Sequence, residues 1–331
     1  MDTNENHIFE PDYSAGFSCI ADKCRHSCCI GWEIDIDEET LRKYRDVPGD
    51  FGKKLLANIA VSDGKSTGPS AHFILAENER CPFLDEKNLC ELIRNLGEGS
   101  LCEICAEHPR FYNYFGDRLE KGYGLCCEEA ARLLLTHKEP IRLLPSSDDS
   151  ETEEDPLFLL REKIFSFLSE RTHSLQTCID NICRIRGIPC ERPDIPHWGA
   201  FFEELERLDP AWNVEIEKLK EASLSESELS SFRAYMEKEG RGSEYRNLLW
   251  YLIYRHFSNA FDEDEACLYV LFSILGTLLV EYLGACRYKE NGSFTMEDQI
   301  DIARMFSSEI EYSDENIDLI LEEISARDNR L

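Results

Sequence analysis

Fifteen cysteines, ten of them between Cys19 and Cys127, are the feature that most constrains how this chain of 331 residues can fold. The first sixteen residues, MDTNENHIFEPDYSAG, are acidic and lack the apolar centre of a signal peptide, so we expect a cytoplasmic protein. In a reducing cytoplasm a cysteine set of this size is seldom a disulfide framework. Metal binding is therefore the better explanation of the cluster.

The ten clustered cysteines fall into four groups with short spacings. The groups are Cys19, Cys24, Cys28 and Cys29; Cys81 and Cys90; Cys102 and Cys105; Cys126 and Cys127. Thiols on one turn can reach a common metal without closing a long, entropically costly loop. Zinc and a [4Fe–4S] cluster each take four such ligands. The sequence predicts a metal or iron–sulfur centre and leaves the choice open, with His26 and His108 as further candidate ligands.

The rest of the chain predicts a mainly α protein. We expect a cysteine-rich, metal-binding N-terminal lobe with few strands over 1–145, an acidic linker over 146–156, and a helical bundle of roughly seven helices over 157–331. Six of the ten residues in 146–155 are acidic and none is apolar. Helical periodicity begins at Leu157 and again at Leu175. Capping pairs at Ser225 with Glu228 and at Thr295 with Asp298 predict two further helix starts.

The segment from Ala266 to Cys286 is largely apolar, which raises the question of a membrane span. A spanning helix needs about 20 apolar residues. Here Glu281 interrupts the run, and the flanks carry no basic excess. We therefore predict a central helix of a soluble core and no membrane partner, and we expect the helix near 266–280 to be the most buried of the chain.

The formal net charge of −30 bears on partners. It repels phosphates, so we expect no nucleic-acid binding, and it suits a partner that presents lysines, although solubility alone would also explain it. The chain has neither a P-loop nor a Gly-x-Gly-x-x-Gly segment after a strand.

These motifs resemble the flagellin lysine-N-methylase family. They also resemble, more distantly, proteins thought to chelate zinc or iron through a Cys-x-x-Cys-x-x-Cys-Cys signature. The matching pieces are Cys19, Cys24, Cys28 and Cys29 with Trp32; Cys81-Pro82-Phe83-Leu84; Leu89-Cys90; Leu96-Gly97-Glu98; Cys105 with Pro109-Arg110; Cys127 with Glu129-Ala130-Ala131-Arg132; and Ile310-Glu311-Tyr312-Ser313-Asp314-Glu315-Asn316.

The chain departs from the family pattern at a few positions. Glu128 stands where the family has proline, His108 stands where an aromatic residue is usual, and Cys102 and Cys126 are additional. The eight metal ligands that the resemblance implies are Cys19, Cys24, Cys28, Cys29, Cys81, Cys90, Cys105 and Cys127. The usual radical pattern, Cys-x3-Cys-x2-Cys, is absent because Cys29 follows Cys28 at once.

The resemblance implies methyl transfer from S-adenosylmethionine to lysine side chains of flagellin, with a [4Fe–4S] or zinc centre. Lysine has a free pKa near ~10.4, so such an enzyme must lower it or supply a base. The candidate catalytic residues are Arg110, Glu120, Tyr123 and Glu129, with Tyr112 and Tyr114 as further helpers. Arg110 could also bind the donor carboxylate. The alternative is a non-catalytic metal-binding or redox-sensing module, or a metal carrier.

Overall fold

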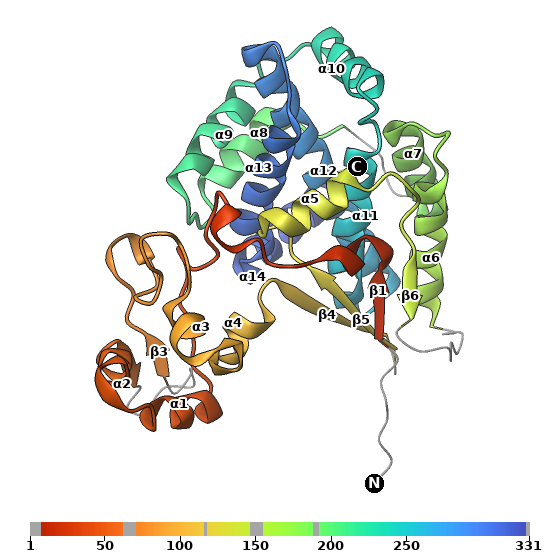
Figure 1. Ribbon diagram of the computed structural model, residues 1–331. Coiled ribbons are helices and arrows are strands. Elements are labelled where there is room, and N and C mark those ends of the chain that lie inside the picture. The colour runs from red at the N-terminus through yellow and green to blue at the C-terminus, as the bar shows by residue number, and fades with distance from the viewer. Residues whose placement is uncertain (1–7, 62–70, 116–117, 146–154, 188–191, 329–331) are drawn as a thin grey trace. The chain divides into compact units, whose positions relative to one another are not determined.

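The computed structural model describes residues 8–61, 71–115, 118–145, 155–187 and 192–328. The chain forms two compact units. The cysteine unit is Ser18–Arg110, and the helical unit combines Met1–Phe17 with Phe111–Leu331. Each unit is traced by colour along the chain in Figure 1.

The cysteine unit contains short elements and a small core. Strands β2 (Ile59–Val61) and β3 (Ala71–Phe73) pair antiparallel, with Ile59 opposite Phe73. Its helices are α1 (Glu38–Arg45), α2 (Gly49–Ala57), α3 (Glu91–Leu96) and α4 (Glu103–Glu107). The Asp37 side chain caps α1 by accepting from Thr40 N at 2.8 Å, and it also accepts from Glu103 N at 3.0 Å, which ties α1 to α4.

The helical unit begins with a four-stranded sheet in the order β4-β5-β1-β6. Its strands are β1 (Ile8–Pro11), β4 (Arg110–Phe115), β5 (Arg118–Tyr123) and β6 (Leu143–Pro145). Strand β1 pairs parallel with β5 and antiparallel with β6. The Asn113 side chain on β4 donates to the Tyr254 carbonyl, so the sheet is attached to the helices.

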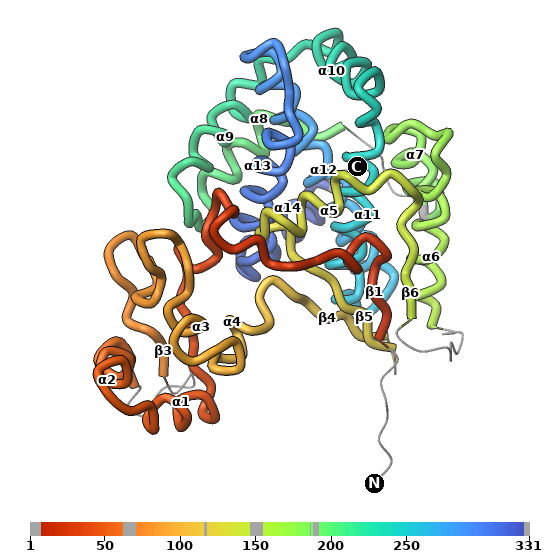
Figure 2. Tube along the Cα trace, in the orientation of Figure 1, coloured from red at the N-terminus to blue at the C-terminus, as the bar shows by residue number. Residues whose placement is uncertain are grey.

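Ten α-helices complete the described part of the helical unit. They are α5 (Glu128–Thr136), α6 (Pro156–Ser169), α7 (Leu175–Arg186), α8 (Ile195–Glu203), α9 (Pro210–Glu221), α10 (Glu226–Lys238), α11 (Glu244–His256), α12 (Glu263–Asn291), α13 (Met296–Phe306) and α14 (Asp314–Asp328). Helix α12 contacts α9, α10, α11, α13 and α14, and α5 lies against α11 and α13 (Figure 2). The protein is mainly α with few strands, as the sequence predicts.

The helix boundaries follow local capping chemistry. Ser225 and Thr295 form capping boxes with Glu228 and Asp298, which confirms both predicted starts. Gly187, with φ of 67°, ends α7 in the left-handed conformation that glycine adopts easily. Among the described residues from 156 onward there are nine α-helices rather than roughly seven, and two of them, α8 and α9, have a proline in their first turn.

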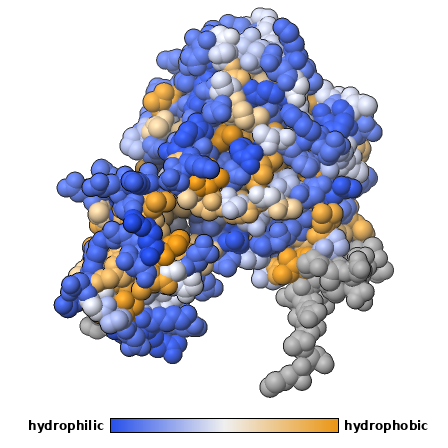
Figure 3. All heavy atoms as spheres, viewed as in Figure 1, coloured by the Kyte–Doolittle hydropathy of each residue, from blue (hydrophilic) through white to orange (hydrophobic). Residues whose placement is uncertain are grey.

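Helix α12 is long and apolar enough to cross a membrane, but 72% of its most apolar window is buried inside the molecule. The expectation that it is the most buried helix is wrong. In α11, 12 of 13 residues are buried, against 16 of 29 in α12. Helix α11 is enclosed because it contacts α5, α6 and α12. The visible surface over α8 to α10 is mostly hydrophilic (Figure 3).

The two units do not coincide with the predicted lobes 1–145 and 157–331. Residues 111–145 and the first strand belong with the helices because β1 closes the sheet between β5 and β6, and because α5 packs on α11 and α13. Pairing of strands that are more than 100 residues apart is not visible in local periodicity. Residues 146–154 of the predicted acidic linker lie outside the described residues.

Candidate metal centre

The folding of the cysteine unit brings three of the four cysteine groups together. The backbone N–H of Cys81 donates to the Cys29 carbonyl at 2.9 Å, which joins the first group to the second. Cys90 forms an isolated β-bridge with Leu84, and Leu84 lies three residues after Cys81 in the chain. Cys102 precedes α4 and Cys105 lies one turn further along it. Cys81 and Cys102 are buried in the small core, and Cys29, Cys90 and Cys105 pack against it.

The thiols are close enough to change one another's acidity. A hydrogen bond between the side chains of Cys28 and Cys29 lowers the pKa of Cys28 to about 7 and raises that of Cys29. Likewise a hydrogen bond with Cys105 lowers the pKa of Cys102. The pKa of Cys105 is raised by that bond, by burial, and by the charges of Cys102, Cys29 and Cys81.

Cys81 is affected differently, because burial raises the pKa of its thiol to about 11. Charges on Cys90 and Cys102 act in the same direction. Without a cation, each hydrogen-bonded pair can give up only one proton easily, since a second thiolate would be repelled by the first. A bound cation removes that repulsion and deprotonates the thiols.

The donor set fits a thiolate-bound metal by its chemistry. Cys29, Cys81, Cys90, Cys102 and Cys105 are soft ligands converging from three chain segments, which suits zinc or an iron–sulfur cluster. Among the residues that the structure describes, no three of the His, Cys, Asp and Glu side chains are already arranged to hold a metal ion. Two pairs of thiols, Cys28 with Cys29 and Cys102 with Cys105, are hydrogen-bonded to each other instead.

The eight predicted ligands are not all in this cluster. Cys19 is exposed, and the Cys24 thiol donates to the His26 carbonyl at 2.6 Å. The ring of the other candidate histidine, His108, lies 5.3 Å from that of Trp32. Cys127 belongs to the helical unit, where it directly precedes α5.

Sequence reasoning missed Cys102. It was set aside as additional to the family pattern, yet it is fully buried and hydrogen-bonded to Cys105. The signal was the Cys102-x-x-Cys105 spacing, which is the usual separation of two thiolates that share one metal.

The predicted catalytic residues lie mostly in structural contacts. Glu120 is fully buried, and both of its oxygens accept from Arg161 at 2.7 Å, which favours a structural role. Glu129 on α5 binds Arg132 through two hydrogen bonds of 2.6 and 2.7 Å. Tyr123 stacks on Phe17 with ring centroids 4.2 Å apart.

The remaining predicted residues lie on strand β4. Arg110 is its first residue, and its Nη1 donates to the Ala106 carbonyl at 2.7 Å. Tyr112 and Tyr114 are exposed side chains on the same strand.

A buried polar network links two motifs of the helical unit that are almost 190 residues apart. Glu311 lies on a π-helical turn (Ser307–Glu311), binds His256 Nε2 at 2.9 Å, and lies 3.4 Å from Arg255 Nε. Arg255 Nη1 donates to the Tyr251 hydroxyl, which accepts from Leu125 N. Glu311 belongs to the family-like motif Ile310–Asn316, and Leu125 lies two residues before Cys127. No local sequence pattern indicates that Arg255 connects them.

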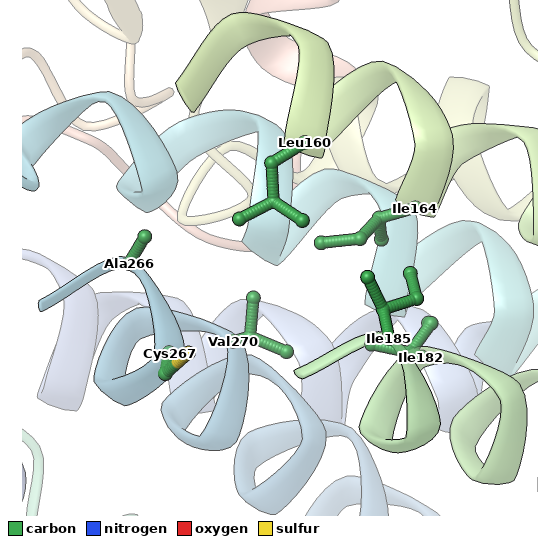
Figure 4. A pocket seen from close by; sticks show the side chains of 7 residues that line it. All are labelled: Leu160, Ile164, Ile182, Ile185, Ala266, Cys267 and Val270. Atoms are coloured by element: carbon green, nitrogen blue, oxygen red, sulfur yellow. The ribbon is translucent and has the colours of Figure 1, made fainter. Parts of the chain in front are cut away.

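A small cavity lies between α6, α7 and α12 (Figure 4). Its walls are the aliphatic side chains of Leu160, Ile164, Ile182, Ile185, Ala266 and Val270, with Cys267 at one end. These walls offer no carboxylate-binding or amine-binding group for S-adenosylmethionine. The cavity is part of the helical core.

This fold and this site define a class of protein that is mainly α and has a compact, thiol-rich unit. Residues 168–330 match the family model of the FliB lysine N-methylase C-terminal domain. By this match and by its curated relatives, the chain is similar to the lysine-N-methylase family.

Curated relatives support this placement. A lysine-N-methylase of Salmonella typhimurium is 26% identical over 161 residues, which are 48% of this chain and 40% of the relative. The flagellar biosynthetic protein FliU of Salmonella muenchen is 27% identical over 138 residues, 41% of this chain and 81% of that protein. The match thus covers less than half the length of the lysine-N-methylases. No solved structure matches the chain.

Proposed function

We propose that this protein methylates lysine side chains of flagellin in the cytoplasm, using S-adenosylmethionine, and that it carries a cysteine-ligated iron–sulfur or zinc centre. The observation that carries the proposal is the match of 168–330 to a lysine N-methylase domain, together with relatives named lysine-N-methylase and FliU. The flagellar name of the second relative is the reason for choosing flagellin as the substrate. The charge of −30 would attract a lysine-bearing partner.

The thiols that would hold the centre are Cys29, Cys81, Cys90, Cys102 and Cys105. When bound, a metal supplies the positive charge that lets these close thiols ionise together, and an iron–sulfur cluster would also supply an electron-transfer group. The chain's own contribution is to bring three segments together through the Cys81 to Cys29 backbone bond and the turn of α4. Metal binding would then contribute directly to folding of the unit.

In a direct transfer, the lone pair of the lysine nitrogen takes the methyl group while the donor's carbon–sulfur bond breaks and a thioether leaves. The ammonium must first lose a proton to a base or to water. Among the predicted helpers, Tyr123 remains a candidate, whereas the arginine bonds of Glu120 and Glu129 oppose their use as a base. Arg110 remains the proposed partner of the donor carboxylate.

The test is a methylation assay under anaerobic conditions. Metal-replete protein is mixed with flagellin and isotopically labelled S-adenosylmethionine, and mass spectrometry locates added methyl groups on lysines. We expect label on flagellin lysines. Equilibrium dialysis with the labelled donor is run alongside, because a donor that binds without transfer separates a wrong substrate from a wrong activity. No label and no donor binding would contradict the proposal.

The alternative is a metal-binding or redox-sensing module without catalysis. The observation that favours it is that the convergent thiols lie in a compact unit of their own. Such a module would bind metal but not S-adenosylmethionine, and a metal carrier would also lose its metal to a weak chelator. The dialysis experiment separates these readings from the enzyme.

A further inference from the structure

Two arginines of the helical unit lie against one short segment. Arg246, in the first turn of α11, donates from Nη1 to the Glu170 carbonyl at 3.3 Å. Arg171 donates from Nη1 to the Asn247 side-chain oxygen at 3.3 Å and from Nη2 to the Glu139 carbonyl, which leaves its Nε without a partner. Each arginine thus binds the residue beside the other, so the two guanidinium groups are neighbours. Both lie inside the matched domain, 168–330.

Neither guanidinium has a carboxylate partner within ion-pair distance among the residues that the structure describes. This is unusual for this chain, because the other well-buried arginines of the helical unit pair with acids: Arg161, Arg241, Arg255, Arg287 and Arg304. The nearby Glu170 carboxylate accepts instead from Thr172, at 2.8 Å from its hydroxyl and 3.2 Å from its N–H. The acids nearest the two arginines act on them only through longer-range charge: Glu139 and Asp12 on Arg171, and Glu170 on Arg246.

Several donors at this place are buried and unsatisfied. The Nε atoms of Arg171 and Arg246 have no hydrogen-bond partner, and neither does Nδ1 of His173. Arg246 is only 5% exposed, so water cannot freely solvate its charge. Burial and the charge of Arg246 lower the pKa of Arg171, which reflects the mutual repulsion.

The backbone adds to the positive character of the site. Arg246 lies at the positive end of α11, a helix of 13 residues, where a cation is disfavoured and an anion is favoured. The N-cap residue, Ser243, makes no side-chain capping bond. Asn247 is held rigidly, because its side-chain amide donates to the carbonyls of Leu134 and His137. Arg171 is therefore anchored at a fixed place.

We propose that Arg171 and Arg246 form a binding site for an oxyanion, the carboxylate or phosphate group of a small ligand. Guanidinium groups bind both through paired, charge-assisted hydrogen bonds. A carboxylate would come from S-adenosylmethionine, with this pair in place of Arg110 as its partner, and a phosphate from a free or metabolite phosphate. The inference goes beyond the proposed function, since it requires neither the metal centre nor methyl transfer.

The experiment measures binding to the full chain by calorimetry and thermal unfolding. The probes are inorganic phosphate and S-adenosylmethionine, each compared with sodium chloride at equal ionic strength. The variants are Arg171→Gln, Arg246→Gln and Arg246→Lys, with Arg184→Gln as the control because Arg184 is an exposed side chain on α7. We expect at least one probe to bind the unmodified protein and raise its melting temperature by several degrees, with binding weakened at least tenfold in both glutamine variants and unchanged in the control.

Each possible result either supports or overturns the proposed anion site. Binding of phosphate alone, or of S-adenosylmethionine alone, supports the site and identifies the source of the anion. No effect of either probe beyond that of chloride overturns it, as does an equal effect in the glutamine variants. Arg171→Gln protects the test against misfolding, because Arg171 is less buried than Arg246. Arg171→Gln also removes a partly buried charge that has no ion-pair partner among the described residues. In the absence of ligand, this variant should therefore be at least as stable as the unmodified protein.

Discussion

The two units of this protein are held together in different ways. Among the residues that the structure describes, the core of the helical unit contains 54 buried apolar residues and that of the cysteine unit contains 11, of which two are cysteines. The cysteine unit spans 93 residues, so relative to its size its core is about half that of the helical unit. Small units with little core usually need an additional link such as a metal. We infer that the cysteines of 18–110 stabilise, by binding a metal, a unit whose apolar burial alone is insufficient for stability.

The largest effect should follow removal of the metal. Stripping it with a strong chelator under reducing conditions should unfold the cysteine unit, because bound zinc can contribute roughly 10–16 kcal/mol in small metal-dependent folds. The helical unit should keep its structure. Hydrogen exchange measured by mass spectrometry separates the two: we expect protection to be lost in 18–110 and retained in α11 and α12. Equal loss of protection in both units would contradict the claim that the two units are stabilised in different ways.

The next largest effect concerns the buried ion pair of the helical unit. Glu120→Gln removes the buried counter-charge of the fully buried Arg161 and leaves it only the partly exposed Glu162 carboxylate at 3.4 Å, so we expect a loss of about 3–5 kcal/mol in unfolding free energy. Chemical denaturation measures this. Glu129→Gln is the matched control, because its partner Arg132 is half exposed, and it should cost less than about 1 kcal/mol. Metal content should be unchanged in both, and a loss of metal in Glu120→Gln would argue against independent units.

A smaller effect is expected at Gly124, which packs under the polar network of the helical unit. A Cβ there would lie 2.2 Å from the Tyr312 hydroxyl and 2.7 Å from Arg255 Nη1. Gly124→Ala should therefore destabilise the unit by about 1–3 kcal/mol as these side chains are displaced. Gly16→Ala is the control, since its Cβ would meet Leu133 at an ordinary 3.7 Å. Thermal unfolding that shows the same midpoint for both variants would show that the network tolerates the methyl group.

The smallest effect is a pH dependence at His256. Burial lowers the pKa of this histidine below its unfolded value near ~6.5, so the unfolded chain binds more protons and stability is lost as pH falls below that value. The loss is at most about 1.4 kcal/mol per pH unit for one group. His256→Gln, which can still donate to Glu311, should flatten the profile between pH 7 and 5. An unchanged slope in the variant would assign the effect to other groups.

Local features of the fold could be predicted from the sequence. The capping pairs at Ser225 and Thr295 depend on residues a few positions apart, and the structure confirms both. The sheet could not be predicted, because β1 pairs with β5 across more than 100 residues. The burial of α11 could not be predicted for a similar reason. Polar residues such as Arg246 and Asn247 suggest an exposed helix, although other elements of the fold enclose it.

The candidate site was predicted in part. The cysteine groups suggested a shared centre, and the structure brings Cys29, Cys81, Cys90 and Cys105 close together. Cys102 was excluded by comparison with a family pattern, although its position one helical turn before Cys105 brings it into the cluster. The anion site at Arg171 was not visible, because an arginine without a counter-ion can be recognised only when its neighbours in space are known.

The central claim is that the cysteine unit holds a metal on its convergent thiols. The most direct measurement is metal and acid-labile sulfide analysis of protein purified without oxygen, for the unmodified chain and for Cys81→Ser, Cys102→Ser, Cys105→Ser and Cys267→Ser. We predict one centre per chain, either zinc or iron with matching sulfide, that is lost or strongly reduced in the first three variants and retained in Cys267→Ser, which alters a helical-core thiol. Metal-free protein, or equal metal content in all four variants, would contradict the account.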